Sequence, residues 1–200
     1  WCCLVGSEMC IRDSDKGGLK VGGRIDYLPF GLFTNIGQFR QIDVMREQVP
    51  KLVVGVHYSH NSGMSSRRGR YSGRLVYLNS NDEESLPDYF KYGLDFLFKY
   101  RGFSALGEFV KSSAIVPDDI TQRVRNDGSI STTFLVNDIQ NVDAYVKGRM
   151  MLGKAYNFQL GYLFKNNFSI DGRYTNLIAD QNSFLNLSLI HISEPTRQHH

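Results

Sequence analysis

The clearest pattern in the chain is the alternation of apolar and polar residues between Tyr89 and Tyr100. In an extended strand, successive side chains point to opposite sides, so this segment divides its residues between two faces. One face carries Phe90, Tyr92, Leu94, Phe96, Phe98 and Tyr100, and the other carries Tyr89, Lys91, Gly93, Asp95, Leu97 and Lys99. The pattern predicts a strand of about twelve residues, longer than a typical soluble strand and long enough to cross a membrane at a tilt.

The same alternation recurs along much of the chain. It predicts further strands over Leu19–Leu28, Lys51–Ser59, Phe103–Ser112, Asn157–Phe164 and Phe168–Leu177. The segment Asn141–Met150 alternates less regularly, and a short helix in a loop is a second interpretation of it. Arg101-Gly102 and Lys165-Asn166-Asn167 predict tight turns, so each joins two of these strands into a hairpin.

Long polar stretches separate the hairpins, at His60–Arg70, Asn79–Asp88 and Ala114–Gln140. Short turns that alternate with long loops, and strands that are apolar on one side only, are typical of an outer-membrane barrel. In lipid every backbone polar group must be bonded within the protein, so strands can cross only as a closed barrel. We therefore predict an all-β fold, an antiparallel transmembrane β-barrel. A soluble β-sandwich that buries the apolar face is the alternative.

The two ends of the chain break this pattern. Leu187–Arg197 and Leu4–Ser14 can be encoded by the two strands of one DNA sequence, which resembles a transposon-end sequencing adapter. We interpret residues 1–14 and 187–200 as translated adapter and exclude them from fold reasoning. The barrel segment is then Asp15–Asn186, and we expect the natural protein to continue beyond both of its limits.

Setting the ends aside changes the composition. All three cysteines and the one tryptophan lie in them, so Asp15–Asn186 can form no disulfide. Removing two basic and three acidic residues raises the formal net charge from +3 to about +4. This excess is mild, and it predicts no nucleic-acid partner. The sequence also lacks the run of about 18 apolar residues that a transmembrane helix requires.

Several short motifs are candidate binding sites. His57 and His60 point to different faces of a strand, which argues against a shared metal, and Gly17–Gly23 lacks the following helix of a dinucleotide loop. Asn81–Ser85 and Pro117–Asp119 lack the spacing of a calcium loop and read as solvated loops. Ser65–Arg70 is either a phosphate-binding segment or a solvated turn. We find no nucleophile with a base, so we predict no enzyme, no metal and no cofactor.

Four segments suggest a family. The stretches "VGGRIDYLPFGLF", "MREQVPKLVVGVHYS", "DFLFKYRGFSALGEFV" and "QLGYLFKNNFSIDGRYT" resemble the phosphate-selective porin O and P family, although the acidic-basic order is reversed at Arg46-Glu47 before Pro50. The resemblance implies a trimeric barrel of about sixteen strands, of which this chain would hold roughly half. It also implies tight turns on the periplasmic side, an inward-folding outer loop at Pro29–Pro50 and a crossing strand at Ser72–Asn79.

Membership of such a family implies a porin of the cell outer membrane that passes small anions, phosphate among them, by passive diffusion. Basic side chains in a confined pore favour anions. The candidates are Lys20, Arg24, Lys91, Lys99 and Arg173 on the strands, with Arg40 and Arg46 in the inward-folding loop. Pairing with Asp26, Asp95, Glu108 and Asp171 is the competing role for these cations. A second function is that of a surface-binding scaffold, and a third is that of a soluble β-sandwich binding module.

Overall fold

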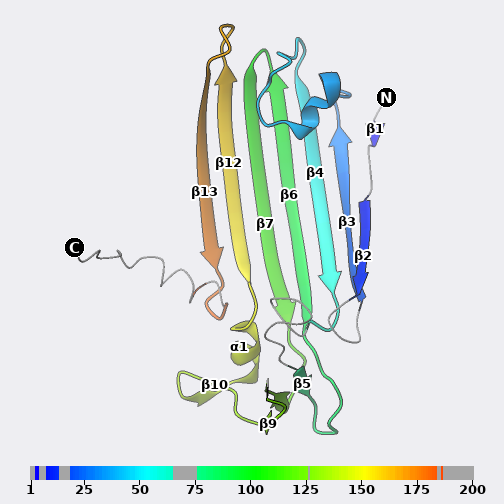
Figure 1. The fold of residues 1–200 in the computed structure, drawn as a ribbon, viewed down its shortest axis with the longest axis vertical. Coiled ribbons are helices and arrows are strands. Elements are labelled where there is room, and N and C mark those ends of the chain that lie inside the picture. The colour runs from blue at the N-terminus through cyan, green and yellow to red at the C-terminus, as the bar shows by residue number, and fades with distance from the viewer. Residues whose placement is uncertain are drawn as a thin grey trace, which may run out of the picture.

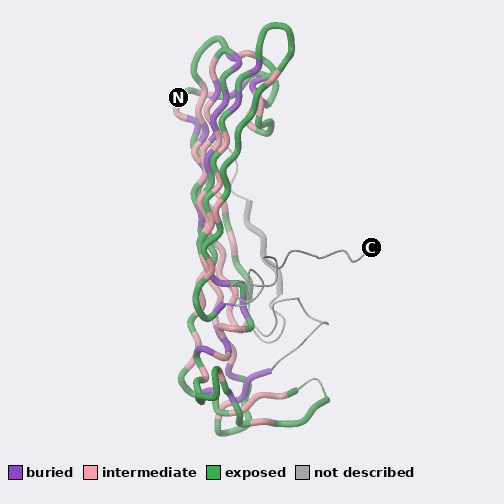
Figure 2. Tube along the Cα trace, turned by 90° about the vertical axis from the view of Figure 1, so that its left-hand side faces the viewer, coloured by how far each residue is buried: buried purple, intermediate pink, exposed green. Residues whose placement is uncertain are grey.

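Long antiparallel strands dominate the computed structural model, which describes residues 19–64, 76–125, 127–183 and 186, together with the backbone of 3–4 and 8–13 (Figure 1). The long strands are β3 (Leu19–Leu28), β4 (Lys51–Asn61), β6 (Asp88–Tyr100), β7 (Phe103–Ile115), β12 (Gly153–Leu163) and β13 (Ser169–Ala179). They lie in the order β3-β4-β6-β7-β12-β13, each antiparallel to its neighbours. Seen edge-on, they form a single layer (Figure 2). The prediction of an all-β, antiparallel fold is confirmed.

Both predicted hairpins are present. Arg101 (φ 48°) and Gly102 (φ 91°) occupy the left-handed region in the two-residue turn between β6 and β7. This backbone matches the twist of paired strands and favours glycine. Asn167 (φ 64°) occupies the same left-handed region in the turn between β12 and β13. In this turn the Phe164 amide donates to the Phe168 carbonyl at 2.8 Å. The turn residues therefore fix the register of both hairpins.

The register separates polar from apolar residues across the whole sheet. One row of paired residues reads Asp26, Gly55, Asp95, Glu108, Asn157 and Thr175. The adjacent row reads Ile25, Val56, Leu94, Phe109, Tyr156 and Asn176. Because adjacent rows point to opposite sides, the sheet has a polar face and an apolar face. The alternation expected within single strands is thus kept in phase between strands.

A small body packs at the end of the sheet where the long loops lie; we call it the long-loop module (Figure 1). It contains β5 (Val76–Leu78), β8 (Gln122–Val124), β9 (Ile130–Ser131), β10 (Leu135–Val136), β11 (Ile139–Gln140) and α1 (Val142–Lys147). Its buried core consists of Tyr77, Ile120, Phe134, Val146, Met150 and Leu152. Of the two interpretations of Asn141–Met150, the helix is correct. The Asn141 side chain caps it by accepting from the Ala144 amide at 2.9 Å.

The expected crossing strand at Ser72–Asn79 is wrong. Its described part forms only β5, which pairs with β8 in a separate sheet, while residues 72–75 lie outside the described residues. β4 pairs directly with β6 over its full length. Tyr77 explains the difference, because its side chain is 2% exposed in the core of the long-loop module. Burial there stabilises β5 away from the main sheet.

The segment 29–50 also lies elsewhere than expected. It contains η1 (Thr34–Phe39) and sits at the same end of the sheet as the two tight turns, not at the opposite end (Figure 1). The reason is topological: since no Ser72–Asn79 strand intervenes, β3, β6 and β12 all run toward this end. We call residues 29–50 the turn-end loop.

The sheet is open in the part of the chain that the structure describes. β1 (Cys3–Leu4) and β2 (Glu8–Asp13) both pair with β3, so the segment interpreted as adapter occupies that edge. β13 forms the other edge. Among the described residues, no helix is both long and apolar enough to cross a membrane.

Candidate functional site

An ion-pair network crosses the centre of the polar face. The Arg24 guanidinium on β3 donates to both carboxylate oxygens of Asp95 on β6, at 2.7 and 2.8 Å, and lies 2.7 Å from Asp26. One strand, β4, separates Arg24 from Asp95, and Gly55 on β4 leaves the space that the side chain passes through. A Cβ at Gly55 would lie 2.2 Å from the Arg24 Nη2. The competing role of Arg24, pairing with acidic neighbours, is the one that this geometry shows.

Lys99 holds the turn-end loop onto the polar face. Its side chain is 2% exposed, and its ammonium donates to the carbonyls of Gly37 and Ile42, at 2.9 and 2.8 Å. The Phe33 ring lies 6.0 Å from the same ammonium. A buried ammonium requires such acceptors, because hydrogen bonds must replace the water it loses. Lys99 is therefore a structural anchor within the described residues.

Two buried carboxylates complete the anchor. Asp43 is 1% exposed and accepts from the amide of Gly102 in the tight turn at 2.8 Å. Glu47 accepts from the amide and hydroxyl of Thr34, at 2.6 and 3.0 Å. The Arg101 amide in turn donates to the Glu47 carbonyl at 2.9 Å. The loop and the β6–β7 turn are thus joined by charge-assisted hydrogen bonds.

Apolar packing fixes the underside of the turn-end loop. Leu28, Phe33, Val53 and Leu97 form a buried cluster with Leu106 packed against it. This cluster holds the loop against the polar face of the sheet, so the loop is a defined structure rather than a solvated connection.

The turn-end loop extends across several strands. At one side, the Lys51 ammonium on β4 donates to the Phe30 carbonyl at 2.8 Å. At the other, the Arg173 guanidinium on β13 donates to the Gln41 side-chain oxygen at 3.3 Å. Between these contacts lie β6, β7 and β12, so the loop bridges the polar face from β4 to β13. The family resemblance implies an inward-folding loop, but no local pattern in the sequence identifies the strands that it spans.

The predicted basic residues do not form one cluster. Lys20, Lys91 and Arg173 are exposed on the polar face, and Arg40 is exposed on the turn-end loop. Arg46 is half-buried, and one of its guanidinium nitrogens lies close to Gly102. Arg24 and Lys99 lie on the same face but make the internal bonds described above. Six of the seven candidates are therefore exposed or partly exposed, and Lys99 is the buried one.

The turn-end loop also presents apolar side chains that sequence reasoning missed. Phe39 is 82% exposed and Ile36 is 62% exposed. Phe30, Leu32, Val44 and Val49 are more than half exposed on the same loop. The sequence carries the signal, because apolar residues recur through 29–50, but the family resemblance assigns this segment to a pore-narrowing loop in which Arg40 and Arg46 are the candidates.

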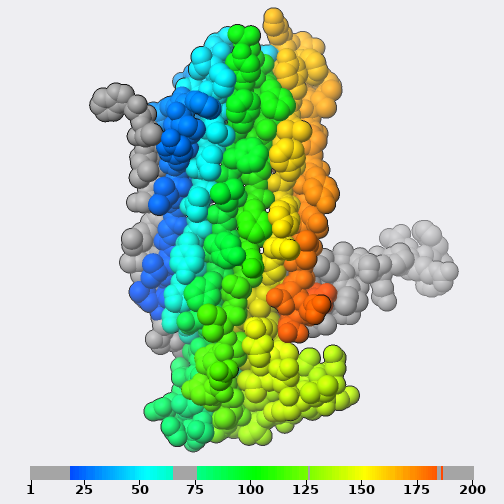
Figure 3. Space-filling view, turned by 180° about the vertical axis from the view of Figure 1, so that it is seen from behind, coloured from blue at the N-terminus to red at the C-terminus, as the bar shows by residue number. Residues whose placement is uncertain are grey.

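The apolar face is exposed over the whole width of the sheet. In the view from behind, no described element covers the strands from β4 to β13 (Figure 3). Large apolar side chains on this face keep between a third and two thirds of their area exposed, among them Ile25, Val56, Tyr58, Leu94, Phe158, Leu160, Ile170 and Tyr174. An exposed apolar surface of this extent marks a face that contacts another apolar phase or partner.

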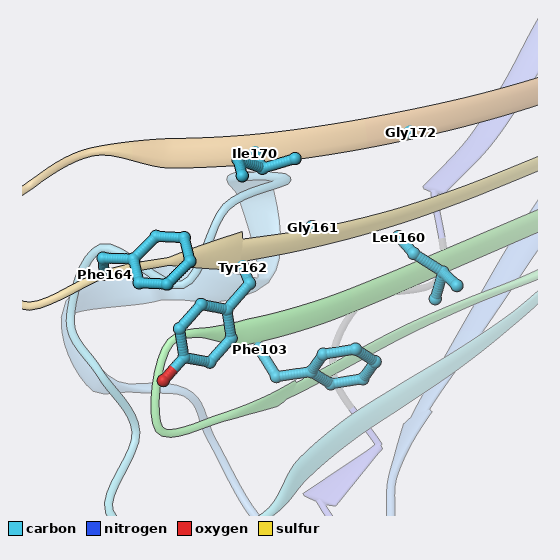
Figure 4. A pocket seen from close by; sticks show the side chains of 7 residues that line it. All are labelled: Phe103, Leu160, Gly161, Tyr162, Phe164, Ile170 and Gly172. Atoms are coloured by element: carbon cyan, nitrogen blue, oxygen red, sulfur yellow. The ribbon is translucent and has the colours of Figure 1, made fainter.

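A shallow depression of about 340 Å³ lies on the apolar face near the tight turns. It is lined by Phe103, Leu160, Gly161, Tyr162, Phe164, Ile170 and Gly172 (Figure 4). Nothing lies within 4 Å of a Cβ placed on Gly172, so the missing side chain opens the depression. Its lining consists of aromatic, aliphatic and glycine residues, which suit hydrocarbon.

The structure places the two histidines on opposite faces of the sheet and brings two of the loop motifs together. His57 lies on the polar face, with its Nδ1 4.0 Å from Asp95, whereas His60 stacks on Phe90 at 4.6 Å on the other face. Asn81–Ser85 and Pro117–Asp119 meet through a Ser85–Asp119 hydrogen bond of 2.6 Å. No group of three potential metal ligands occurs among the residues that the structure describes. Ser65–Arg70 lies outside them.

Comparisons of the chain with protein-family models, curated proteins and solved structures return no match. Function is therefore inferred from the faces of the sheet and the charges that they carry.

Proposed function

We propose that the sheet is part of the wall of an outer-membrane β-barrel porin that passes small anions, phosphate among them, by passive diffusion. The observation that carries the proposal is the exposed apolar face opposite a charged one, kept in register over six long strands. A barrel places such an apolar face against lipid and the polar face around water. Lipid of the outer membrane is then the partner of the apolar face, and the family resemblance suggests a homotrimer for the complete protein.

Aromatic residues support the lipid-facing assignment. Four aromatic side chains lie near the tight turns: Phe103, Tyr162, Phe164 and Phe168. The Tyr162 and Phe164 rings pack edge-on, with their centroids 4.8 Å apart. Aromatic girdles of this kind mark the interface between hydrocarbon and water in membrane barrels. The depression beside them fits a lipid acyl chain.

Within this proposal, the turn-end loop narrows the pore at its periplasmic end, because short turns face the periplasm in such barrels. Lys99 and the carboxylates of Asp43 and Glu47 hold the loop in place, so they do not line the path themselves. The exposed cations make the electrostatic potential in the pore more positive, which favours anions. They are Lys20, Lys91, Arg40 and Arg173, and Arg46 lies beside the turn. Arg24 contributes less, because Asp26 and Asp95 neutralise it.

The test is conductance of the complete protein, recovered by extending the coding sequence beyond both ends of this segment. In a planar bilayer with a potassium chloride gradient, we expect stepwise ohmic channels and a reversal potential on the anion-selective side. A scaffold barrel would insert without a steady conductance. A β-sandwich would remain in solution without detergent and show no channels, which contradicts the proposal.

A further inference from the structure

Two arginines converge on one phenol oxygen in the long-loop module. Arg123 on β8 donates through Nη1 to the Tyr145 hydroxyl, and Arg149, just after α1, donates through Nη2 to the same oxygen at 3.0 Å. Their guanidinium carbons lie 4.7 and 5.1 Å from the centre of the Tyr145 ring. Two positive charges are thus held around a single side chain.

The position of this cluster is set by rigid neighbours. The Arg123 Nε donates to the Thr133 carbonyl at 2.9 Å. The Tyr145 ring packs edge-on against Phe134, with centroids 5.4 Å apart, and Phe134 is fully buried in the core of the module. A site whose groups are locked by packing is pre-organised for a ligand.

Carboxylates do not balance these two charges. Among the ion pairs of the described residues, neither Arg123 nor Arg149 takes part in one. Asp143 on the same helix is paired with Lys147 at 2.8 Å. Like charges that share one hydrogen-bond acceptor repel each other, and an anion bound to both would offset the repulsion.

A second phenol lies within the field of the two arginines. Burial raises the pKa of Tyr77, while the positive charges of Arg123 and Arg149 act in the opposite direction. Tyr77 is therefore a neutral phenol at physiological pH, and it adds no negative charge to the cluster. The excess of positive charge remains.

We infer that Arg123, Arg149 and Tyr145 form a binding site for a phosphate-type oxyanion. A guanidinium has five N–H donors, of which Arg123 uses two and Arg149 uses one in the contacts above. The remaining donors suit the geometry of phosphate oxygens. The ligand is either free phosphate or a phosphate-bearing lipid headgroup. The inference does not depend on a pore, because the cluster lies outside the main sheet.

The test measures binding of inorganic phosphate to the full chain in detergent micelles by calorimetry, in a chloride buffer of matched ionic strength. We expect Arg149→Gln to weaken binding at least tenfold, because the exposed guanidinium supplies most of the unused donors. Arg149→Lys, which keeps the charge but loses the planar fork, should fall between wild type and Arg149→Gln. Arg125→Gln is the matched control: Arg125 follows the same strand and donates to Ser131 at 3.4 Å. It should change affinity less than twofold.

A second arm identifies the source of the phosphate. The same variants are measured for binding to phosphatidylcholine vesicles with and without phosphatidic acid. If the protein binds free phosphate and Arg149→Gln removes this binding, the ligand is the free ion. If the protein binds only the vesicles that contain phosphatidic acid, the ligand is the lipid headgroup. If wild type binds neither, or if Arg125→Gln weakens binding as much as Arg149→Gln, the inference is wrong. Conductance is not the readout, so this failure is separate from failure of the porin proposal.

Discussion

At the scale of single residues, glycines and buried charges decide which contacts the polar face can make. Gly55 lets the Arg24 side chain cross β4 to reach Asp95, and Gly102 places its amide on Asp43. Lys99 and Lys91 are both lysines on the same face of β6, yet the first is buried under the turn-end loop and the second is exposed. Residue type alone therefore does not distinguish an anchor from a cation that faces solvent.

Gly55→Ala should separate Arg24 from Asp95, because the new Cβ would occupy the path of the guanidinium. We expect a loss of about 1 kcal/mol in unfolding free energy, kept small because Arg24 retains 40% exposure. Denaturant titration in detergent measures it. Gly172→Ala is the control, since nothing lies within 4 Å of its Cβ. Equal effects of the two substitutions would contradict the prediction.

Lys99→Met should release the turn-end loop. The carbonyls of Gly37 and Ile42 would lose their donor, and Asp43 and Glu47 would lose a neighbouring positive charge. We expect a loss of roughly 2–4 kcal/mol and faster amide exchange in residues 29–50. Hydrogen exchange followed by mass spectrometry checks both. Lys91→Met, on the same face and exposed, should change stability by less than about 0.5 kcal/mol.

At the scale of elements, the long strands and the long-loop module are stabilised by different means. Strand positions follow from local alternation and from the turns at Arg101-Gly102 and Lys165-Asn166-Asn167. The long-loop module depends instead on a small core that joins β5, α1 and the segment around Phe134. These parts are distant in sequence, so no local pattern predicts that they meet.

Phe134→Ala should therefore disrupt the module while sparing the strands. The removed ring leaves a cavity in a core where Phe134 is 0% exposed, and the expected loss is about 3–5 kcal/mol. Limited proteolysis should cut within residues 116–151 while the hairpins stay intact. Ile139→Ala, at a side chain that is 68% exposed, serves as the control and should leave the cleavage pattern unchanged.

At the scale of the whole molecule, the main feature is a single-layer sheet with one face exposed and apolar (Figures 2 and 3). A single layer cannot bury that face within the described residues. Lipid contact would bury it, and closure of the sheet into a barrel would pair the edge of β13. The porin proposal accounts for both features with one arrangement.

Leu94→Arg should impair membrane insertion. Leu94 lies near the middle of β6 on the apolar face and is 47% exposed. A charge at the bilayer midplane of a barrel costs roughly 2–4 kcal/mol. Thr175→Arg adds the same charge on the polar face, where water would solvate it, and should insert normally. Folding yield into lipid vesicles, read by heat-modifiable gel mobility, compares the two, and an equal yield would argue against a lipid-facing surface.

The sequence alone determined the strands, the two hairpin turns and the division of the sheet into two faces. β3 begins and ends where predicted, β6 begins one residue earlier than predicted, and β7 ends three residues later. These features could be predicted because alternation and turn chemistry act between neighbours in the chain. The tertiary structure decided where the turn-end loop lies, why Lys99 is buried and where β5 belongs. Those outcomes depend on contacts such as Lys99 to Gly37, 62 positions apart, whose partners no local pattern identifies.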